Sequence, residues 1–244
     1  MNNDKLLSIC IMYFLTKYAI LFFLTIIIIF VMYFLMYRKY YSPKYKGRGY
    51  CNINNEYTLP KIYNNFISPQ ETKHILQLAT PLFRESRLVS GFSENIRKSE
   101  TAWLSPSDPV IKQIIERVCT ITNLPFENCE KMQVVKYEPN GFYNAHYDAS
   151  CDDKKECVEF EKNGGQRVVT MILYLNDDFT EGYTEFPNLK KQYKPEKYSG
   201  LLFYSLEKNG NKCHPLSLHA GMPVKSGTKY IANVWLREQK YNIL

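Results

Sequence analysis

Histidine is scarce in this chain, with four residues among 244, and excess positive charge is missing from most of its length. The formal net charge is +7, but residues 1–37 contribute +1 and segment 38–48 contributes +5, which leaves +1 for everything after it. A nucleic-acid-binding face needs cationic residues spread over the folded domain, so this distribution excludes nucleic acid as a partner. Internal repeats are absent too, and we expect one medium-sized domain plus an appendage.

The appendage is an uncharged apolar segment of twenty residues, 18–37. This length crosses a bilayer as a helix, and no polar face interrupts it, as one would in a buried globular helix. The basic residues that follow argue against a cleaved signal peptide and suit lipid head groups. We therefore predict a short N-terminal segment (1–17), a transmembrane helix (18–37), a basic juxtamembrane tether (38–60) and a folded domain (61–244), with the lipid bilayer as a partner.

The orientation of this single-pass arrangement is open. The positive-inside rule keeps the basic cluster, and with it the folded domain, in the cytosol. Six cysteines follow the apolar segment, an even number that permits disulfides and weakly favours an oxidising lumen. Cys151 and Cys157 are near enough in sequence to close a small loop, although free buried cysteines are an equal alternative.

Helix signals come early in the folded domain and strand signals come late. Ser68-Pro69-Gln70-Glu71 has the pattern of a capping box with proline at the first helical position, and a second helix is predicted from Ser107-Asp108-Pro109. Arg167–Leu175 is apolar on both faces, as in a strand buried between two layers, and Leu201–Tyr204 and Tyr230–Leu236 are similar. This order predicts an α+β, mainly β domain in which the helices back one sheet of a β-sandwich or jelly roll.

Two of the four histidines belong to a candidate metal site. If Tyr143–Asp148 is a strand, its side chains alternate between faces, so His146 and Asp148 point the same way. His219 is the best candidate for a third ligand. Two imidazoles and one carboxylate form the ligand face of non-haem iron(II) oxygenases. On this spacing alone, a satisfied polar pair or a zinc site remains an alternative.

A lysine at a fixed distance from His219 favours the iron interpretation. Lys229 follows ten residues later, across the turn-rich connector Gly221–Gly227, which predicts that the two lie on neighbouring antiparallel strands. A lysine that points into a metal pocket is costly unless an anion meets it, and a dicarboxylic co-substrate that chelates the metal would place its far carboxylate there. The remaining histidines, His74 and His214, are interpreted as bystanders.

Three segments carry a family resemblance. Residues 133–148 (QVVKYEPNGFYNAHYD), 164–187 (GGQRVVTMILYLNDDFTEGYTEFP) and 217–237 (SLHAGMPVKSGTKYIANVWLR) closely resemble the catalytic domains of prolyl 4-hydroxylases, which are iron(II)- and 2-oxoglutarate-dependent dioxygenases. The resemblance implies a double-stranded β-helix, which is a jelly roll, for residues 61–244. It also implies Fe(II), the co-substrate 2-oxoglutarate and L-ascorbate as cofactors, and a proline-rich peptide as substrate.

The resemblance assigns a role to each matching residue. His146, Asp148 and His219 would hold the iron and form the catalytic centre. Lys229, Tyr137 and, as a weaker candidate, Thr170 would bind 2-oxoglutarate. Tyr143, Arg167 and Trp235 match positions that contact the peptide. Two positions depart from the family pattern: Glu181-Gly182 replaces Gly-Gly at a turn, and Arg237 stands where collagen-type relatives often carry histidine, which leaves the peptide preference open.

We therefore predict a membrane-anchored prolyl 4-hydroxylase. Membrane-anchored relatives face the lumen of the endoplasmic reticulum, and the resemblance favours that side against the positive-inside count. The alternatives are hydroxylation of another side chain such as lysine on the same iron core, a non-catalytic peptide-binding module, and, more distantly, a zinc hydrolase, for which no general base is placed. A composition rich in Asn, Lys, Tyr and Ile is compatible with a viral origin.

Overall fold

A computed structural model describes residues 57–87, 95–150, 162–207 and 213–241, together with Tyr18, Thr25, Val31 and Met32. The chain divides into two units, Met1–Lys46 and Gly47–Leu244, and the fold lies in the second unit. It is mainly β, as the sequence predicts, with two sheets forming a jelly roll and few helices.

The larger sheet has seven antiparallel strands, in the order β1-β11-β7-β14-β5-β4-β2. Its strands are β1 (Lys61–Tyr63), β2 (Arg84–Glu85), β4 (Glu100–Leu104), β5 (Met132–Tyr137), β7 (Arg167–Tyr174), β11 (Gly200–Tyr204) and β14 (Lys229–Arg237). The three apolar segments predicted as buried strands are β7, β11 and β14, which lie at the centre of this sheet. These predictions are confirmed.

The smaller sheet has five strands in the order β10-β9-β12-β6-β3, and a separate pair is formed by β13 and β8. The strands are β3 (Arg97–Lys98), β6 (Phe142–His146), β9 (Thr184–Phe186), β10 (Lys191–Tyr193), β12 (His219–Gly221), β8 (Thr180–Glu181) and β13 (Val224–Ser226). A buried cluster joins the two sheets: Tyr137, Tyr174 and Phe203 come from the larger one and Phe186 from the smaller one.

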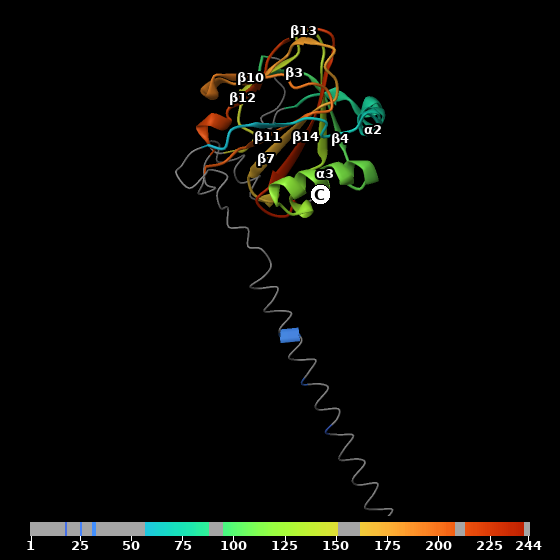
Figure 1. Cartoon of the computed structure of the whole chain (residues 1–244), viewed down its shortest axis with the longest axis vertical. Helices are drawn as coiled ribbons and strands as arrows, with labels where there is room; N and C mark the ends of the chain where they lie inside the picture. Colours follow the sequence, from blue (N-terminus) through green and yellow to red (C-terminus); the bar gives the residue numbers. More distant parts are fainter. Residues whose placement is uncertain are drawn as a thin grey trace, which may run out of the picture. The chain divides into compact units, whose positions relative to one another are not determined.

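Both predicted helices are present. Helix α2 (Pro69–Ala79) begins with a complete capping box between Ser68 and Glu71, because each satisfies a backbone N–H that the helix leaves unpaired. Helix α3 (Pro109–Thr122) is capped by Asp108, whose carboxylate accepts two backbone N–H bonds. Helix α2 packs against β4 and α3 (Figure 1), so the helices back the larger sheet. The short 3₁₀ turns are η1 (Thr80–Leu82), η2 (Phe126–Asn128), η3 (Pro187–Leu189) and η4 (Pro215–Ser217).

The prediction that His219 and Lys229 lie on neighbouring strands is wrong. His219 lies on β12 in the smaller sheet, whereas Lys229 begins β14 in the larger sheet. The connector does not fold back as a hairpin, because its middle, β13, pairs with β8 instead. Gly227 has a φ of 76° and lies so close to Asp178 that a Cβ would be 2.5 Å from its carbonyl oxygen. This glycine lets the chain turn from the β13–β8 pair into the larger sheet.

The predicted single-pass membrane location is not upheld. Among the residues that the structure describes, no helix is long and apolar enough to cross a membrane. A crossing helix needs about twenty consecutive apolar residues, and the structure describes four residues of segment 18–37. The rest of that segment, the predicted N-terminal segment 1–17 and most of the tether 38–60 lie outside the described residues.

The structure tests the disulfide prediction for the cysteines among its described residues. Cys119 and Cys129 are free thiols, and Cys129 is buried. Cys213 is disulfide-bonded. Cys151 and Cys157 lie outside the described ranges, so the loop predicted between them stays a prediction.

Candidate active site

The three predicted metal ligands converge at one end of the smaller sheet. His219 on β12 lies directly opposite His146 on β6, and Asp148 follows two residues after β6 ends. One ligand atom from each lies within 4.8 Å of the others. Oδ1 of Asp148 is 3.8 Å from Nε2 of His146, and Oδ2 is 3.7 Å from Nε2 of His219.

Backbone carbonyls fix the tautomer of both imidazoles. Nδ1 of His146 is 2.8 Å from the oxygen of Asn144, and Nδ1 of His219 is 3.0 Å from that of Ser217. A carbonyl oxygen can only accept a hydrogen bond, so each Nδ1 carries the proton and each Nε2 presents its lone pair to Asp148. This is the arrangement that a divalent cation requires.

The charge state of the group also suits a cation. Burial, together with the charge of His219, lowers the pKa of His146 to about 3, which keeps this ring neutral. Burial alone would raise the pKa of Asp148, but the electrostatic interactions with His219, His146 and Arg167 hold it below its usual value. Two imidazoles and one carboxylate are the donors that iron(II) accepts in this geometry.

Two side chains of the larger sheet hold Asp148 in place. Thr170 Oγ1 donates to Oδ2 of Asp148 over 2.5 Å, and Trp235 Nε1 donates to the same oxygen over 3.1 Å. Thr170 and Trp235 are paired across β7 and β14, so the sheet register sets both donors at once. The sequence predicts a co-substrate contact for Thr170 and a peptide contact for Trp235. The structure adds a contact with Asp148 to both.

A buried ion cluster lies behind the indole. Arg167, predicted as a peptide contact, places its guanidinium 3.7 Å from the centre of the Trp235 ring and pairs with Glu130 through two nitrogens, at 2.5 and 2.8 Å. Arg237 also reaches Glu130, at 2.8 Å. Burial alone would raise the pKa of Glu130, but the two guanidinium charges lower it. The carboxylate is 3% exposed, so one buried anion pairs with two cations.

Tyr143 covers the other side of the metal group. Its ring stacks on His146, with ring centres 3.6 Å apart, and the guanidinium of Arg97 lies 4.6 Å from the tyrosine ring. The sequence predicts a peptide contact for Tyr143, and its position beside the metal group is compatible with that role. Arg97 and Glu130 are absent from the sequence predictions. Arg167 at the start of β7 and Arg237 at the end of β14 suggest a buried carboxylate between them, but nothing in the sequence identifies Glu130 as its source.

Lys229 lies in an aromatic pocket and is 1% exposed. Its ammonium nitrogen is 5.4 Å from the ring centre of Tyr137, 5.7 Å from Tyr174 and 5.9 Å from Phe179, and it donates to the carbonyl of Gly182 over 2.8 Å. Within the described residues no carboxylate pairs with it. Burial, together with the charge of Lys194, lowers the pKa of Lys229 from 10.5 to about 7.

The same aromatic cluster reaches the metal group, because Phe186 and Phe203 both contact the His219 ring, with ring centres 5.7 and 4.7 Å away. Phe186, Phe203 and Tyr137 belong to one buried cluster. A charged lysine without an anion is unfavourable in such surroundings. These surroundings therefore suit a ligand that offers a carboxylate to Lys229, as the dicarboxylate 2-oxoglutarate does.

Comparison with known proteins agrees with this geometry. The pattern of the 2OG-Fe(II) oxygenase superfamily matches residues 132–237. A prolyl 4-hydroxylase homologue of Acanthamoeba polyphaga mimivirus is 47% identical over 194 residues, covering 80% of each chain. The chain belongs to the prolyl 4-hydroxylase family of 2OG-Fe(II) oxygenases.

Two further relatives support the family. Prolyl 4-hydroxylase 1 of Arabidopsis thaliana is 33% identical over 73% of this chain and 68% of its own. The solved viral collagen prolyl hydroxylase of Paramecium bursaria Chlorella virus-1, in complex with 2-oxoglutarate, is 29% identical with a TM-score of 0.59 and covers 73% of this chain and 95% of its own. As a 2OG-Fe(II) oxygenase, this family member is a dioxygenase that uses Fe(II) and 2-oxoglutarate.

Proposed function

We propose that the protein is a prolyl 4-hydroxylase. It hydroxylates peptidyl proline at C4, consumes O2 and 2-oxoglutarate, and releases succinate and CO2. The observation that carries the proposal is the combination of the His146–Asp148–His219 group with a buried Lys229 that has no carboxylate partner among the described residues. Relatives named prolyl 4-hydroxylases support proline as the target, and residues 61–244 would form the catalytic domain.

The side chains would divide the work between the metal, the co-substrate and the peptide. Iron(II) held by His146, Asp148 and His219 supplies the chemistry that couples O2 and 2-oxoglutarate to C–H hydroxylation. Lys229 would hold the distal carboxylate of 2-oxoglutarate, and the Tyr137 ring would wall the same pocket. Because these groups are buried, water is excluded from the co-substrate.

The positions around Asp148 would orient the metal and the peptide. Thr170 and Trp235 fix the carboxylate through their hydrogen bonds, which leaves its other oxygen for the ion. Tyr143 and Arg167 would line the path of a proline-rich peptide, whose extended conformation is already ordered before binding. L-ascorbate would keep the iron in its ferrous state between turnovers.

The test is incubation of the purified chain with proline-rich peptides, Fe(II) and 2-oxoglutarate, with succinate and peptide mass as readouts. We expect iron-dependent succinate release and the gain of one oxygen at proline. His146→Ala and His219→Ala should abolish both, whereas the matched control His74→Ala should not, because His74 pairs with Asp108 outside the site. Oxygen on lysine instead would favour the alternative hydroxylase, and peptide binding without succinate a non-catalytic module.

A further inference from the structure

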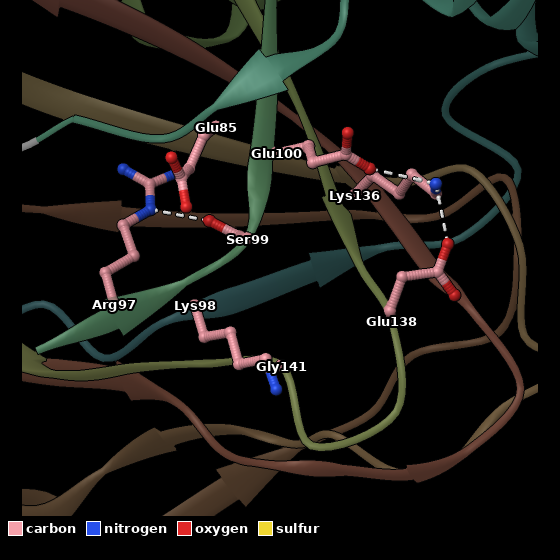
Figure 2. A pocket seen from close by; sticks show the side chains of 8 residues that line it. All are labelled: Glu85, Arg97, Lys98, Ser99, Glu100, Lys136, Glu138 and Gly141. Carbon is pink, nitrogen blue, oxygen red and sulfur yellow. Dashed lines mark hydrogen bonds and ion pairs between the residues drawn. The ribbon is translucent and has the colours of Figure 1, made fainter. Parts of the chain in front are cut away.

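A charged pocket lies where the edges of the two sheets meet (Figure 2). Strand β2 is the edge of the larger sheet and β3 is an edge of the smaller one, and the single residue Ser99 carries the chain from β3 into β4. The pocket has a volume of about 280 Å³. Ligand pockets for whole small molecules start at about 300 Å³, so this one has room for one or two side chains.

The pocket adjoins the active site through two side chains. Arg97 lines the pocket and its guanidinium lies over the ring of Tyr143. Tyr143 in turn stacks on His146. A peptide whose target residue lies at the metal group can therefore extend past Tyr143 into this pocket.

One side of the pocket is cationic, formed by Arg97 and Lys98. Arg97 is 7% exposed, yet its hydrogen bonds go to neutral hydroxyls, Ser99 at 2.8 Å and Thr101 at 3.3 Å. In the described part of the chain no carboxylate lies within ion-pair distance of Arg97 or Lys98. A buried guanidinium with only neutral partners gains from an arriving anion.

The other side is acidic, formed by Glu100 and Glu138, whereas Glu85 is drawn on the same side as Arg97 (Figure 2). Lys136 pairs with Glu100 at 2.9 Å and with Glu138 at 2.6 Å, so two carboxylates share one ammonium group. Figure 2 shows this triplet across the pocket from Arg97. A single charge would be attracted by one side and repelled by the other, whereas a pair of opposite charges is attracted by both.

We propose that this pocket binds two oppositely charged side chains of the peptide substrate, next to the target proline. The acidic residue lies against the cationic side, nearer to Tyr143, and the basic residue lies against the acidic side. This inference rests on the proposed function for its ligand, a peptide. It adds that the enzyme selects peptides by the charges that flank the proline.

The first experiment compares peptides with one proline-containing core and five flanks: Glu-Lys, Lys-Glu, Glu-Glu, Lys-Lys and Ala-Ala. Binding of labelled peptides is measured by fluorescence anisotropy without iron, and KM and kcat by succinate release. We expect one mixed-charge order to bind about tenfold more tightly than Ala-Ala, since exposed charge pairs contribute up to about fivefold each. The advantage should shrink as salt rises, and kcat should stay the same. Equal affinity for all five overturns the proposal.

The second experiment reverses one charge. Lys98→Glu should weaken the preferred peptide about tenfold and leave Ala-Ala unchanged, and a peptide with lysine in place of its acidic residue should recover affinity for the variant. The matched control is Lys112→Glu on α3, where the side chain is 53% exposed. Equal weakening of every peptide would indicate a structural effect and overturn the proposal. Turnover of all peptides without a charge preference would refute the proposed role of this pocket and leave the proposed function intact. Charge-dependent binding without succinate release would refute the proposed function and leave the role of the pocket intact.

Discussion

Replacing Lys229 by methionine tests the proposed co-substrate site most directly, because the lysine is buried and no carboxylate among the described residues pairs with it. Its pKa falls from 10.5 to about 7, which at 1.36 kcal/mol per pKa unit disfavours the charged form by roughly 5 kcal/mol. Loss of the hydrogen bond to Gly182 costs the variant about 1 kcal/mol. Without 2-oxoglutarate, Lys229→Met should therefore be about 3–4 kcal/mol more stable than the wild type below pH 7.

The pH dependence has a defined sign. The folded pKa lies below the unfolded one, so the unfolded chain binds more protons between pH 7 and 10.5, and wild-type stability rises with pH across this window. The penalty is present in full below pH 7 and is gone by pH 10.5. The stability gap between Lys229→Met and the wild type should narrow accordingly.

The assay is chemical denaturation at several pH values, with and without 2-oxoglutarate. The co-substrate should stabilise the wild type and not the variant, because it binds only the folded state and needs the ammonium group. Above pH 7, binding to the wild type should take up a proton, which calorimetry in buffers of different ionisation enthalpy detects. Lys112→Met on α3 is the control. Parallel pH profiles for wild type and Lys229→Met, or equal protection of both by 2-oxoglutarate, would refute the reasoning.

Two further predictions concern the support of the metal group. Trp235→Phe keeps an aromatic ring over Arg167 but removes the hydrogen-bond donor to Asp148. The affinity for Fe(II) or Co(II), measured by titration, should therefore fall about tenfold or more. Unchanged affinity would show that this hydrogen bond does not orient Asp148. Glu130→Gln removes the buried carboxylate that pairs with Arg167 and Arg237, so the free energy of unfolding should fall by about 3–5 kcal/mol. A loss below about 1 kcal/mol would contradict this account.

The metal group could be predicted from sequence because its chemistry restricts the choice of residues. With four histidines in the chain, few combinations can supply two imidazoles beside Asp148. Lys229 was singled out by its spacing from His219 and by the family resemblance, because a lysine that points into a metal pocket needs an anionic partner. The helix starts at Ser68 and Asp108 were predictable from local capping patterns alone.

The remaining contacts depend on how strands from distant segments align. A turn-rich connector does not say whether the chain returns to the same sheet or crosses to the other, so the placement of His219 and Lys229 on neighbouring strands was wrong. The bonds from Thr170 and Trp235 to Asp148 need both the β7–β14 register and the facing of the two sheets. Arg97 is buried, but no local sequence pattern distinguishes it from a surface arginine.

Strand β14 has a consequence for how this enzyme can be altered. It carries Lys229 at its first residue and Arg237 at its last, with Trp235 between them, and it is hydrogen-bonded to β5 on one side and to β7 on the other. Inserting or deleting a single residue within it would turn every later side chain to the opposite face. The spacing between Lys229 and Trp235 is thus fixed by the number of strand residues between them. Side chains along β14 can be exchanged, but the length of the strand cannot be changed.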